Sequence, residues 1–325
     1  MRWNIRSLIC GAFGFSFGKI LVDNEALERV KEFCPAKLNL FLAVTNRRDD
    51  GFHELVSVVS QIDVGDTLVA QISVDSEFEL SCDDVSVPID QSNLVIQAAE
   101  QFRVRSGWNQ GVKFELRKVT PMGAGLGGGS SDAAGALRAM NRLAGAPLSQ
   151  RELADISVDI GSDCPLFFAE SPVVIRGRGE HIEPLRPSTC ARLVGRDVLV
   201  VKPPFGINTG WAYGRLAEPA PPDYMPKSDA EQHLRDWIED SNAAPEALGF
   251  NSFERPIGAK FAALPAMAEN LREKFGRTLH LSGSGSACYI WPRAESESAA
   301  IAEAIRADWG SKVWIISAKI VGDLA

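Results

Sequence analysis

The feature that most constrains this chain is a run of glycines between two patterned segments. Five of the seven residues from Gly123 to Gly129 are glycine, within the sequence PMGAGLGGGSSDAAG. Glycine loses more conformational entropy on folding than any other residue, so such a run requires a structural or functional reason. Alternating residues over 112–119 predict a strand before the run, and the apolar period from Ala133 to Leu143 predicts a helix after it. We therefore expect a tight loop that joins a strand to the start of a helix.

A loop of this kind is suited to bind an anion, because the first turn of a helix has unpaired N–H groups and a partial positive charge. Glycines lack Cβ atoms, so phosphate oxygens can approach the backbone closely. Either serine at the end of the run can cap the helix, donate to a phosphate or contact Mg²⁺. The sequence thus predicts a phosphate site formed by Pro121, Met122, Gly123, Ala124, Gly125, Leu126, Gly127, Gly128, Gly129, Ser130 and Ser131.

Three other interpretations of the glycine run are weaker. A Walker A loop requires a lysine after the glycines, and none is present. The dinucleotide pattern GxGxxG is formally met, but the acidic residue expected about 20 positions later falls inside a helical pattern, at Glu152. A flexible surface loop without a ligand is the third alternative. The strand and the amphipathic helix that flank the run argue against it.

The rest of the chain mixes strands and helices without a regular βαβ rhythm, which predicts an α+β fold in two domains. A change to mixed polar composition near 186–196 suggests the boundary. We expect domains at 34–190 and 191–325, and a disordered extension or an early start codon over 1–33. The predicted strands are 34–44, 55–63, 66–74, 78–82, 112–119, 197–204 and 312–321, with a hairpin at 172–185 and a strand–turn–strand unit at 279–292. The predicted helices are 92–107, 150–160 and 295–309.

Two local signals near the middle of the chain are more specific. Ser149 and Glu152 have the spacing of a capping box, which places a helix start at 150. The segment DCPLFF, residues 163–168, is expected to be extended, because Pro165 disfavours helix just before it.

Composition limits the class of partner and the compartment. The net charge of -8 and the pI of about 5.2 argue against a nucleic acid or an anionic membrane as the main partner. Six cysteines without CxxC spacing predict a reduced, cytoplasmic protein without disulfides, and four scattered histidines predict no zinc site. The apolar run 8–17 allows a weak signal-peptide interpretation, but it is too short for a membrane span.

Three segments in order resemble the motifs of the GHMP kinases, the family of galacto-, homoserine, mevalonate and phosphomevalonate kinases. They are PAKLNLFLAV near the start, PMGAGLGGGSSDAA in the middle and LSGSGSACYI near the end. DGFHEL and GSDCPLFF narrow the resemblance to the branch that phosphorylates 4-diphosphocytidyl-2-C-methyl-D-erythritol. The resemblance extends from about Cys34 to the C-terminus. It implies an N-terminal domain like domain 2 of ribosomal protein S5, a ferredoxin-like C-terminal domain, and an active site between them.

The resemblance also implies a reaction and two catalytic residues. The γ-phosphate of ATP, with Mg²⁺, would be transferred to a hydroxyl of a cytidine diphosphate-linked small molecule, giving the 2-phosphate in the non-mevalonate isoprenoid pathway. Asp163 matches the family's catalytic aspartate and would accept the hydroxyl proton or stabilise charge; the alternative is a turn-stabilising aspartate. Lys37 matches the motif lysine and is expected to pair with Asp163; the alternative is a solvated strand-end charge.

Further residues are implied to bind substrate. Asn39 would hydrogen-bond the substrate, His53 would bind the cytosine edge, and the rings of Phe52 and Tyr213 would stack on the base. Phe52 departs from the tyrosine common in the family and so loses a hydroxyl. The second glycine turn, Gly283, Ser284 and Gly285, is expected to support the phosphate region or the substrate diphosphate, or only to pack on the first loop. Ser131 is a weak candidate Mg²⁺ ligand.

Two rival functions remain open from the sequence. One is a GHMP kinase that acts on another alcohol or phosphate ester, of the homoserine or mevalonate type. The other is a non-catalytic nucleotide-binding protein on the same fold. We expect a monomer or homodimer, with no nucleic-acid or membrane partner.

Overall fold

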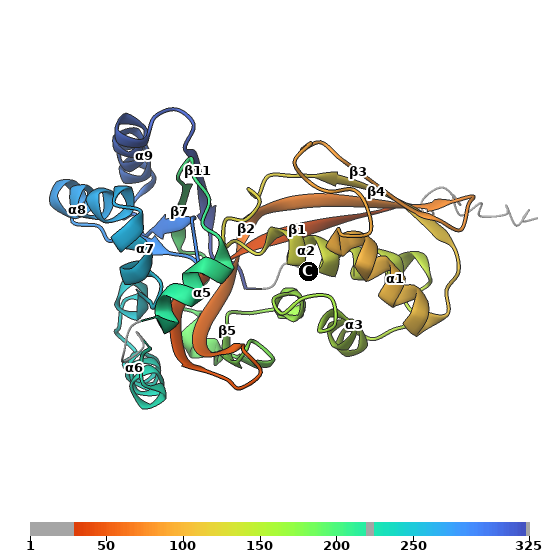
Figure 1. Ribbon diagram of the computed structural model, residues 1–325, viewed down its shortest axis with the longest axis horizontal. Helices are drawn as coiled ribbons and strands as arrows, with labels where there is room; N and C mark the ends of the chain where they lie inside the picture. The colour runs from red at the N-terminus through yellow and green to blue at the C-terminus, as the bar shows by residue number, and fades with distance from the viewer. Residues whose placement is uncertain (1–28, 219–223, 323–325) are drawn as a thin grey trace, which may run out of the picture.

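The computed structural model describes residues 29–218 and 224–322, and it contains two sheets with helices packed against each (Figure 1). Residues 1–28 of the predicted extension therefore lie outside the described residues. For residues 29–33 the predicted disorder is wrong, because β1 begins at Arg29, before the predicted boundary at 34. The early start follows from pairing, because Arg29 lies opposite Gln71 of the neighbouring strand.

The larger sheet has seven strands, in the order β3-β4-β2-β1-β8, with β5 on β2 and β6 on β5. At its centre is the antiparallel pair β1 and β2, and these strands are long enough to pair with further strands as well. One half of β2 pairs with β4 and the other half with β5. The strands are β1 (Arg29–Arg47), β2 (His53–Ser73), β3 (Phe78–Cys82), β4 (Gly111–Arg117), β5 (Val173–Gly177), β6 (His181–Pro184) and β8 (Phe250–Asn251).

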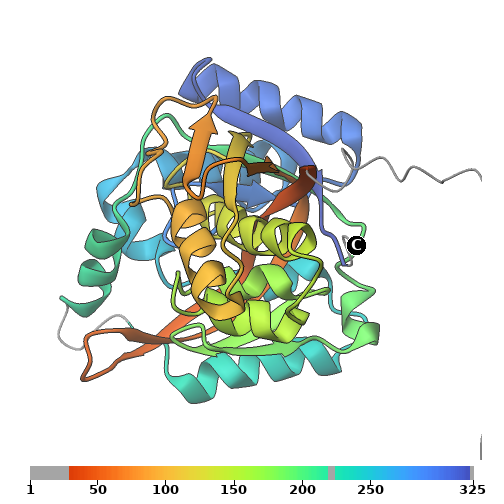
Figure 2. The ribbon, with the colours of Figure 1, turned by 90° about the vertical axis from the view of Figure 1, so that its right-hand side faces the viewer.

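Three helices cover one face of this sheet, as Figures 1 and 2 show. The Asn93 side chain caps the first of them by accepting from Val95 N at 2.9 Å, and Gly107 ends it with φ 71°. The predicted capping box of Ser149 and Glu152 is present at the start of the third. The helices are α1 (Leu94–Ser106), α2 (Gly128–Leu143) and α3 (Gln150–Ser157).

The predicted extended conformation of DCPLFF is wrong. Cys164–Phe168 form a 3₁₀ helix, η2, and Asp163 is its N-cap residue with φ -91° and ψ -10°. Proline is tolerated in the first turn of a helix, where its missing N–H has no partner to lose. Pro165 therefore begins a helical turn here instead of excluding one.

The smaller sheet has four antiparallel strands in the order β11-β7-β10-β9. Counted along the chain, this is fourth, first, third, second, the order of a ferredoxin-like sheet. The chain passes from the larger sheet to the smaller between β6 and β7, after the short helix α4 (Pro187–Cys190). The strands are β7 (Asp197–Lys202), β9 (His280–Leu281), β10 (Cys288–Ile290) and β11 (Trp314–Lys319).

Five helices and one 3₁₀ turn complete the C-terminal part. They are α5 (Thr209–Ala217), α6 (Lys227–Glu239), η3 (Pro245–Leu248), α7 (Glu254–Lys260), α8 (Ala263–Phe275) and α9 (Glu295–Trp309). The segment β8 follows η3 but pairs in parallel with β1, so the C-terminal half of the chain contributes a strand to the N-terminal sheet. A single cut at 190 therefore does not separate the two sheets completely.

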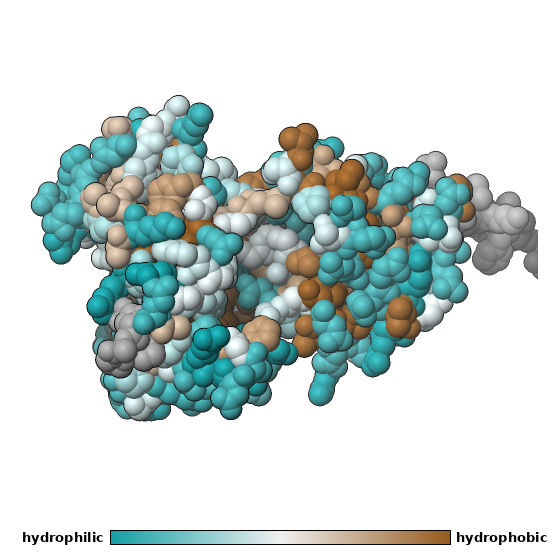
Figure 3. Space-filling view, viewed as in Figure 1, coloured by the Kyte–Doolittle hydropathy of each residue, from teal (hydrophilic) through white to brown (hydrophobic). Residues whose placement is uncertain are grey.

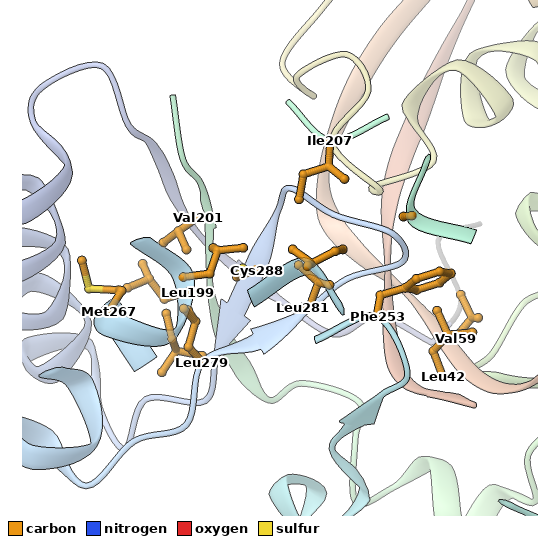
Figure 4. Packing of buried hydrophobic residues seen from close by; sticks show 14 of the residues in the cluster. Leu42, Val59, Leu199, Val201, Ile207, Phe253, Met267, Leu279, Leu281 and Cys288 are labelled. Atoms are coloured by element: carbon orange, nitrogen blue, oxygen red, sulfur yellow. The ribbon is translucent and has the colours of Figure 1, made fainter. Parts of the chain in front are cut away.

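One apolar core spans both sheets. Leu42 and Val59 of the larger sheet belong to the same buried cluster as Leu199, Val201 and Leu281 of the smaller one (Figure 4). Burial of such side chains contributes about 1.5–3 kcal/mol each. The two halves are therefore held together by a shared core, and the space between them has fixed walls. Figure 3 shows the surface hollowed between the two halves.

Candidate functional site

The glycine loop joins β4 to α2, as the sequence predicts. Gly123, Gly125 and Gly127 all have positive φ, from 60° to 81°, which L-residues with a side chain rarely adopt. Gly127 is the N-cap of α2 and supplies no side-chain cap. The first N–H groups of α2 are thus available to a ligand, which is the condition for an anion site at a helix start.

The loop is held from two sides. Lys37 N donates to Leu126 O at 2.9 Å, which ties the loop to β1. Ala287 N donates to Ala124 O at 2.9 Å, and the Ser282 hydroxyl donates to Gly125 O at 3.1 Å, which ties the loop to the β9–β10 turn. A Cβ on Gly125 would lie 2.4 Å from Ser282 O. The glycine at 125 is therefore required by the approach of the second turn.

A pocket of about 330 Å³ lies over the glycine loop. Every residue from Pro121 to Ser130 of the predicted phosphate site lines it, and Ser131 does not. The Ser131 side chain is fully buried, and its Oγ has no hydrogen-bond partner. Outside the loop the walls include Asn93 at the cap of α1, and the remaining lining residues are Val87, Pro88, Ser92, Leu94, Lys118 and Asp132.

Beneath the loop lies a buried charge cluster that sequence reasoning missed. Lys118 Nζ lies 2.5 Å from Asp66 Oδ2 and 2.7 Å from Asp132 Oδ2. Asp66 Oδ1 also accepts from the backbone N–H groups of Val119 and Thr120, at 2.6 and 2.8 Å. Burial raises the pKa of Asp132 to about 7, against the opposing effect of Lys118. Two carboxylates share one ammonium, and the neighbouring charge of Asp66 adds to the rise in the pKa of Asp132.

A second, larger cavity of about 630 Å³ lies between the two halves and shares Gly125 and Gly127 with the loop pocket. Lys37 and Asp163 line one end of it, and Lys37 Nζ lies 3.9 Å from Asp163 Oδ2. The Lys37 side chain is 5% exposed and that of Asp163 is 44% exposed. Burial lowers the pKa of Lys37, and the Asp163 charge opposes that shift.

Asn39 orients this end of the cavity. Its Oδ1 accepts from Lys37 Nζ at 2.5 Å, and its Nδ2 donates to the Ser57 hydroxyl at 2.9 Å. Ser57 in turn donates to Phe41 O. The chain of hydrogen bonds runs across β1 and β2, so the ammonium of Lys37 is held in place by groups of two paired strands.

Aromatic side chains, here called the aromatic end, form another part of the cavity lining, and the charge of Asp163 reaches Tyr213 among them. The His53 ring lies 4.7 Å from the Tyr213 ring, centroid to centroid, and Tyr213 packs edge-on against Phe253 at 4.8 Å. Burial and the nearby Arg47 lower the pKa of His53, so its imidazole is neutral at neutral pH. The Phe52 ring is half exposed, with the Arg178 guanidinium 5.2 Å from its centroid. His53 Nε2 also lies 3.1 Å from the Tyr224 hydroxyl.

The second glycine turn packs directly on the first loop. A Cβ on Gly283 would lie 3.3 Å from Gly125 O and 3.4 Å from Lys37 Nζ. Gly283 and Ser284 line the cavity, whereas Gly285 does not. The Asn251 side chain holds the turn by donating to Leu281 O and Gly283 O, and the Ser284 hydroxyl is 2.9 Å from that of Thr209.

Sequence reasoning missed several residues of the site for identifiable reasons. Asp66 and Lys118 are ordinary strand-end charges in the sequence, and only the sheet brings them together. Asn251 and Thr209 come from segments without a motif. Asp132 gave no signal either, because it lies beyond the first turn of α2, where a carboxylate would interact with the helix dipole.

Within residues 29–218 and 224–322, no group of three or more histidine, cysteine or carboxylate side chains forms a metal site. The helices of the same residues include none that is long and apolar enough to span a bilayer. The cysteines that the structure describes, at 34, 82, 164, 190 and 288, are free.

Comparison with known proteins gives consistent relatives. Residues 93–169 match the family described as GHMP kinases N terminal domain. The chain is 37% identical over 265 residues to a 4-diphosphocytidyl-2-C-methyl-D-erythritol kinase of Synechococcus sp. (strain CC9902), covering 79% of this chain and 85% of that relative. It is also 37% identical over 274 residues to the chloroplastic enzyme of that name from Arabidopsis thaliana, covering 82% and 68% of the two chains.

Solved structures give the same picture. A crystal structure of 4-(cytidine 5'-diphospho)-2C-methyl-D-erythritol kinase superposes with a TM-score of 0.71 at 31% identity, over 89% of this chain and 99% of that one. The mevalonate kinase of Methanococcus jannaschii superposes with a TM-score of 0.68 at 15% identity, over 90% and 98% of the chains. The second likeness concerns the fold alone, and both structures share the two-part α+β architecture described above.

Proposed function

This chain belongs to the 4-diphosphocytidyl-2-C-methyl-D-erythritol kinases of the GHMP kinase superfamily, and from that premise we propose which groups of the molecule perform each part of the reaction. The chain is an ATP-dependent kinase. Its acceptor is 4-diphosphocytidyl-2-C-methyl-D-erythritol, and the product carries the new phosphate on the 2-hydroxyl, in the non-mevalonate isoprenoid pathway. The kinases of other alcohols share only the fold with this chain, at 15% identity for the mevalonate kinase.

One observation carries the assignment of the site. A single cavity adjoins the glycine loop, and its lining contains both the Lys37–Asp163 pair and several aromatic side chains. Its charged lining comprises three cations, Lys37, Arg47 and Arg178, against the carboxylate of Asp163. In a chain with a net charge of -8, this local excess of positive charge suits a diphosphate.

ATP would place its phosphates on the glycine loop. The unpaired N–H groups at the start of α2 supply donors, and the missing Cβ atoms supply room. Lys118 lines this pocket with its charge already shared between Asp66 and Asp132, so it acts mainly to hold the loop base. Gly125 and Gly127 border both cavities, so the γ-phosphate of ATP bound on the loop would lie next to the Lys37–Asp163 pair.

Mg²⁺ would be held mostly by ATP oxygens and water. Ser131 is the candidate protein ligand, although its side chain lies behind the loop and does not line the pocket. The fit is supported by the Ser131 hydroxyl, which is fully buried without a hydrogen-bond partner in the first turn of α2. When bound, the ion would neutralise charge on the transferred phosphate.

Lys37 and Asp163 would act at the acceptor hydroxyl. Asp163 is partly exposed to the cavity and can accept the proton of a hydroxyl placed beside it. The buried ammonium of Lys37 lies 3.9 Å from that carboxylate and would stabilise the developing negative charge on oxygen. Asn39 fixes the position of the ammonium and would share in binding the acceptor.

The cytidine would occupy the aromatic end. Neutral His53 offers one donor and one acceptor to the base edge, and the rings of Phe52 and Tyr213 provide faces for stacking. The second glycine turn would support the diphosphate through the backbone of Gly283 and Ser284, which line the same cavity.

The proposal is tested by measuring ADP release and product formation with a panel of acceptors. With 4-diphosphocytidyl-2-C-methyl-D-erythritol we expect stoichiometric ADP and a new phosphate monoester. Homoserine, mevalonate and methylerythritol phosphate without cytidine should give at most background. Equal turnover of an acceptor that lacks cytidine would contradict the assignment of the aromatic end, and binding without turnover would favour a non-catalytic protein.

Compartment and assembly remain predictions. The free cysteines of the described residues support the proposal of a reducing, cytoplasmic environment. Whether the protein is a monomer or a homodimer is open to sedimentation velocity, which would give the mass directly.

A further inference from the structure

We propose that Tyr224 is a positioning residue that holds His53 as the tautomer with its proton on Nδ1, and thereby makes the site select cytosine over uracil. This inference rests on the proposed function of the aromatic end of the cavity. It adds a residue that does not line the cavity and belongs to none of the three motifs.

The contact itself is specific. The Tyr224 hydroxyl lies 3.1 Å from His53 Nε2, and the two rings meet edge-on at 5.8 Å between centroids. On its other side the His53 ring packs against Tyr213 at 4.7 Å. The imidazole is thus fixed between two tyrosines, with Nε2 engaged and Nδ1 left for a ligand.

Tyr224 is delivered to this position from a distant part of the sequence. Met225 N donates to Val44 O at 3.1 Å, which docks the segment on β1. Lys227 Nζ lies 4.0 Å from Glu54 Oε2, beside His53 at the start of β2. The hydrogen bond between Met225 and Val44 positions the neighbouring Tyr224, so that its hydroxyl lies within hydrogen-bond distance of His53.

The sense of the hydrogen bond follows from the ionisation of the groups. The pKa of His53 is lowered by burial and by Arg47, and the pKa of Tyr224 is raised by burial against the effect of Arg47. Burial raises the pKa of Tyr213 to about 12. All three rings are therefore neutral at neutral pH. The phenol O–H is a stronger acid than an imidazole N–H, so Tyr224 donates and Nε2 accepts, which leaves the ring proton on Nδ1.

A donor at Nδ1 distinguishes the two pyrimidines. Cytosine has an acceptor at N3, whereas uracil has an N–H donor there. An Nδ1–H group that faces N3 therefore pairs with cytosine and opposes uracil. An analogue that leaves a polar group of the binding site without a hydrogen-bond partner binds much more weakly than the matching substrate.

The direct test is the tautomer of His53 in the substrate-free protein, measured by ¹⁵N NMR of histidine-labelled enzyme. The signal is assigned by its loss in His53→Gln. We expect the Nδ1–H form in the unmodified protein and a shift toward the Nε2–H form in Tyr224→Phe, which keeps the ring and removes the hydroxyl. The same form in both proteins, or Nε2–H in the unmodified protein, would overturn the proposal.

The kinetic test compares Tyr224→Phe with Ser228→Ala, a control at an exposed position of the same segment. We expect Tyr224→Phe to raise KM for the cytidyl substrate by roughly 3- to 10-fold, the usual effect of one neutral hydrogen bond, with kcat within about twofold. The preference of Tyr224→Phe for the cytidyl substrate over the uridyl analogue should fall by a similar factor, and Ser228→Ala should match the parent. A tautomer shift without a change in KM or preference would also overturn the proposal.

These two tests separate this inference from the proposed function. The NMR measurement needs no substrate, so it reports on Tyr224 even if the acceptor is another compound. Failure of every cytidyl acceptor would contradict the proposed function while the tautomer result stands.

Discussion

A buried ammonium beside a half-exposed carboxylate is the central pair at the scale of residues. Lys37 loses hydration, which lowers its pKa, and recovers interaction energy from Asn39 and Asp163. Burial of a lysine without a partner costs free energy. The proposed role of Lys37 at the acceptor hydroxyl explains why this side chain is buried on β1. The motif resemblance indicated both residues, and the fold brings them to 3.9 Å.

The buried cluster under the glycine loop gives a pH prediction. The pKa of Asp132 is raised to about 7 in the folded protein by burial, whereas an unfolded aspartate titrates near its ordinary value. A raised carboxylate pKa means that the folded state binds the proton more tightly. Stability from this group is therefore present at low pH and is lost as the pH rises through about 7.

We expect Asp132→Asn to remove this dependence. Between pH 6 and 8 the free energy of unfolding of the parent should fall by about 1 kcal/mol relative to the variant, measured by urea denaturation at each pH. Asp155→Asn, at an exposed position of α3, is the control and should follow the parent. Parallel curves for the parent and Asp132→Asn would show that Asp132 is ionised throughout.

The meeting of two glycine turns is the main feature at the scale of elements. The sequence predicts the strand, the loop and α2 from alternation, glycine content and helical period, and all three are confirmed. The sequence offers packing of the second glycine turn on this loop as one alternative, but it does not predict which atoms meet, because the contact joins residues more than a hundred positions apart. The sequence also predicted an extended segment where η2 forms, because proline is compatible with the first turn of a helix.

A matched pair of alanine variants tests the contact between the turns. Gly125 and Gly145 both have φ +81°, but a Cβ meets Ser282 O at 2.4 Å in the first and nothing within 4 Å in the second. Both variants carry the backbone strain, about 1 kcal/mol. Only Gly125→Ala must also displace the second turn. We expect it to raise KM for ATP at least about tenfold, and Gly145→Ala to leave KM unchanged.

Steady-state kinetics at saturating acceptor would measure the effect, with the melting temperature of each variant as a check on folding. Equal KM values for ATP in the two variants would show that the turn contact has no part in nucleotide binding.

At the scale of the whole molecule, a shared apolar core fixes the two halves around the cavity. Leu42 of the larger sheet and Leu199 of the smaller belong to one cluster, and β8 crosses from one half to the other. The two-domain α+β fold followed from the motif resemblance and the mixed elements. The crossing strand could not be predicted, because β8 is two residues long and has no pattern of its own.

The N-terminal boundary gives a whole-molecule prediction. Removal of residues 1–28 leaves β1 and its pairing with β2 complete, so we expect kcat and melting temperature to match the full chain. Removal of residues 1–33 deletes the paired segment from Arg29, including Glu32, which holds Arg138 at 3.0 Å. That longer deletion should lower the melting temperature by several degrees. A folded but inactive 29–325 protein would show that the first residues contribute to the reaction.

The most direct measurement of the central claim is a single-turnover assay of Asp163→Asn with [γ-³²P]ATP and the cytidyl acceptor, beside ATP binding by calorimetry. Removal of the carboxylate should slow phosphate transfer by roughly 10²- to 10⁴-fold, the range for loss of a general base, while the Kd for ATP stays within about twofold. Asp159→Asn, exposed just outside the cavity, serves as control and should react like the parent. Transfer at the parental rate in Asp163→Asn would contradict the account, because the acceptor hydroxyl would then react without the Lys37–Asp163 pair.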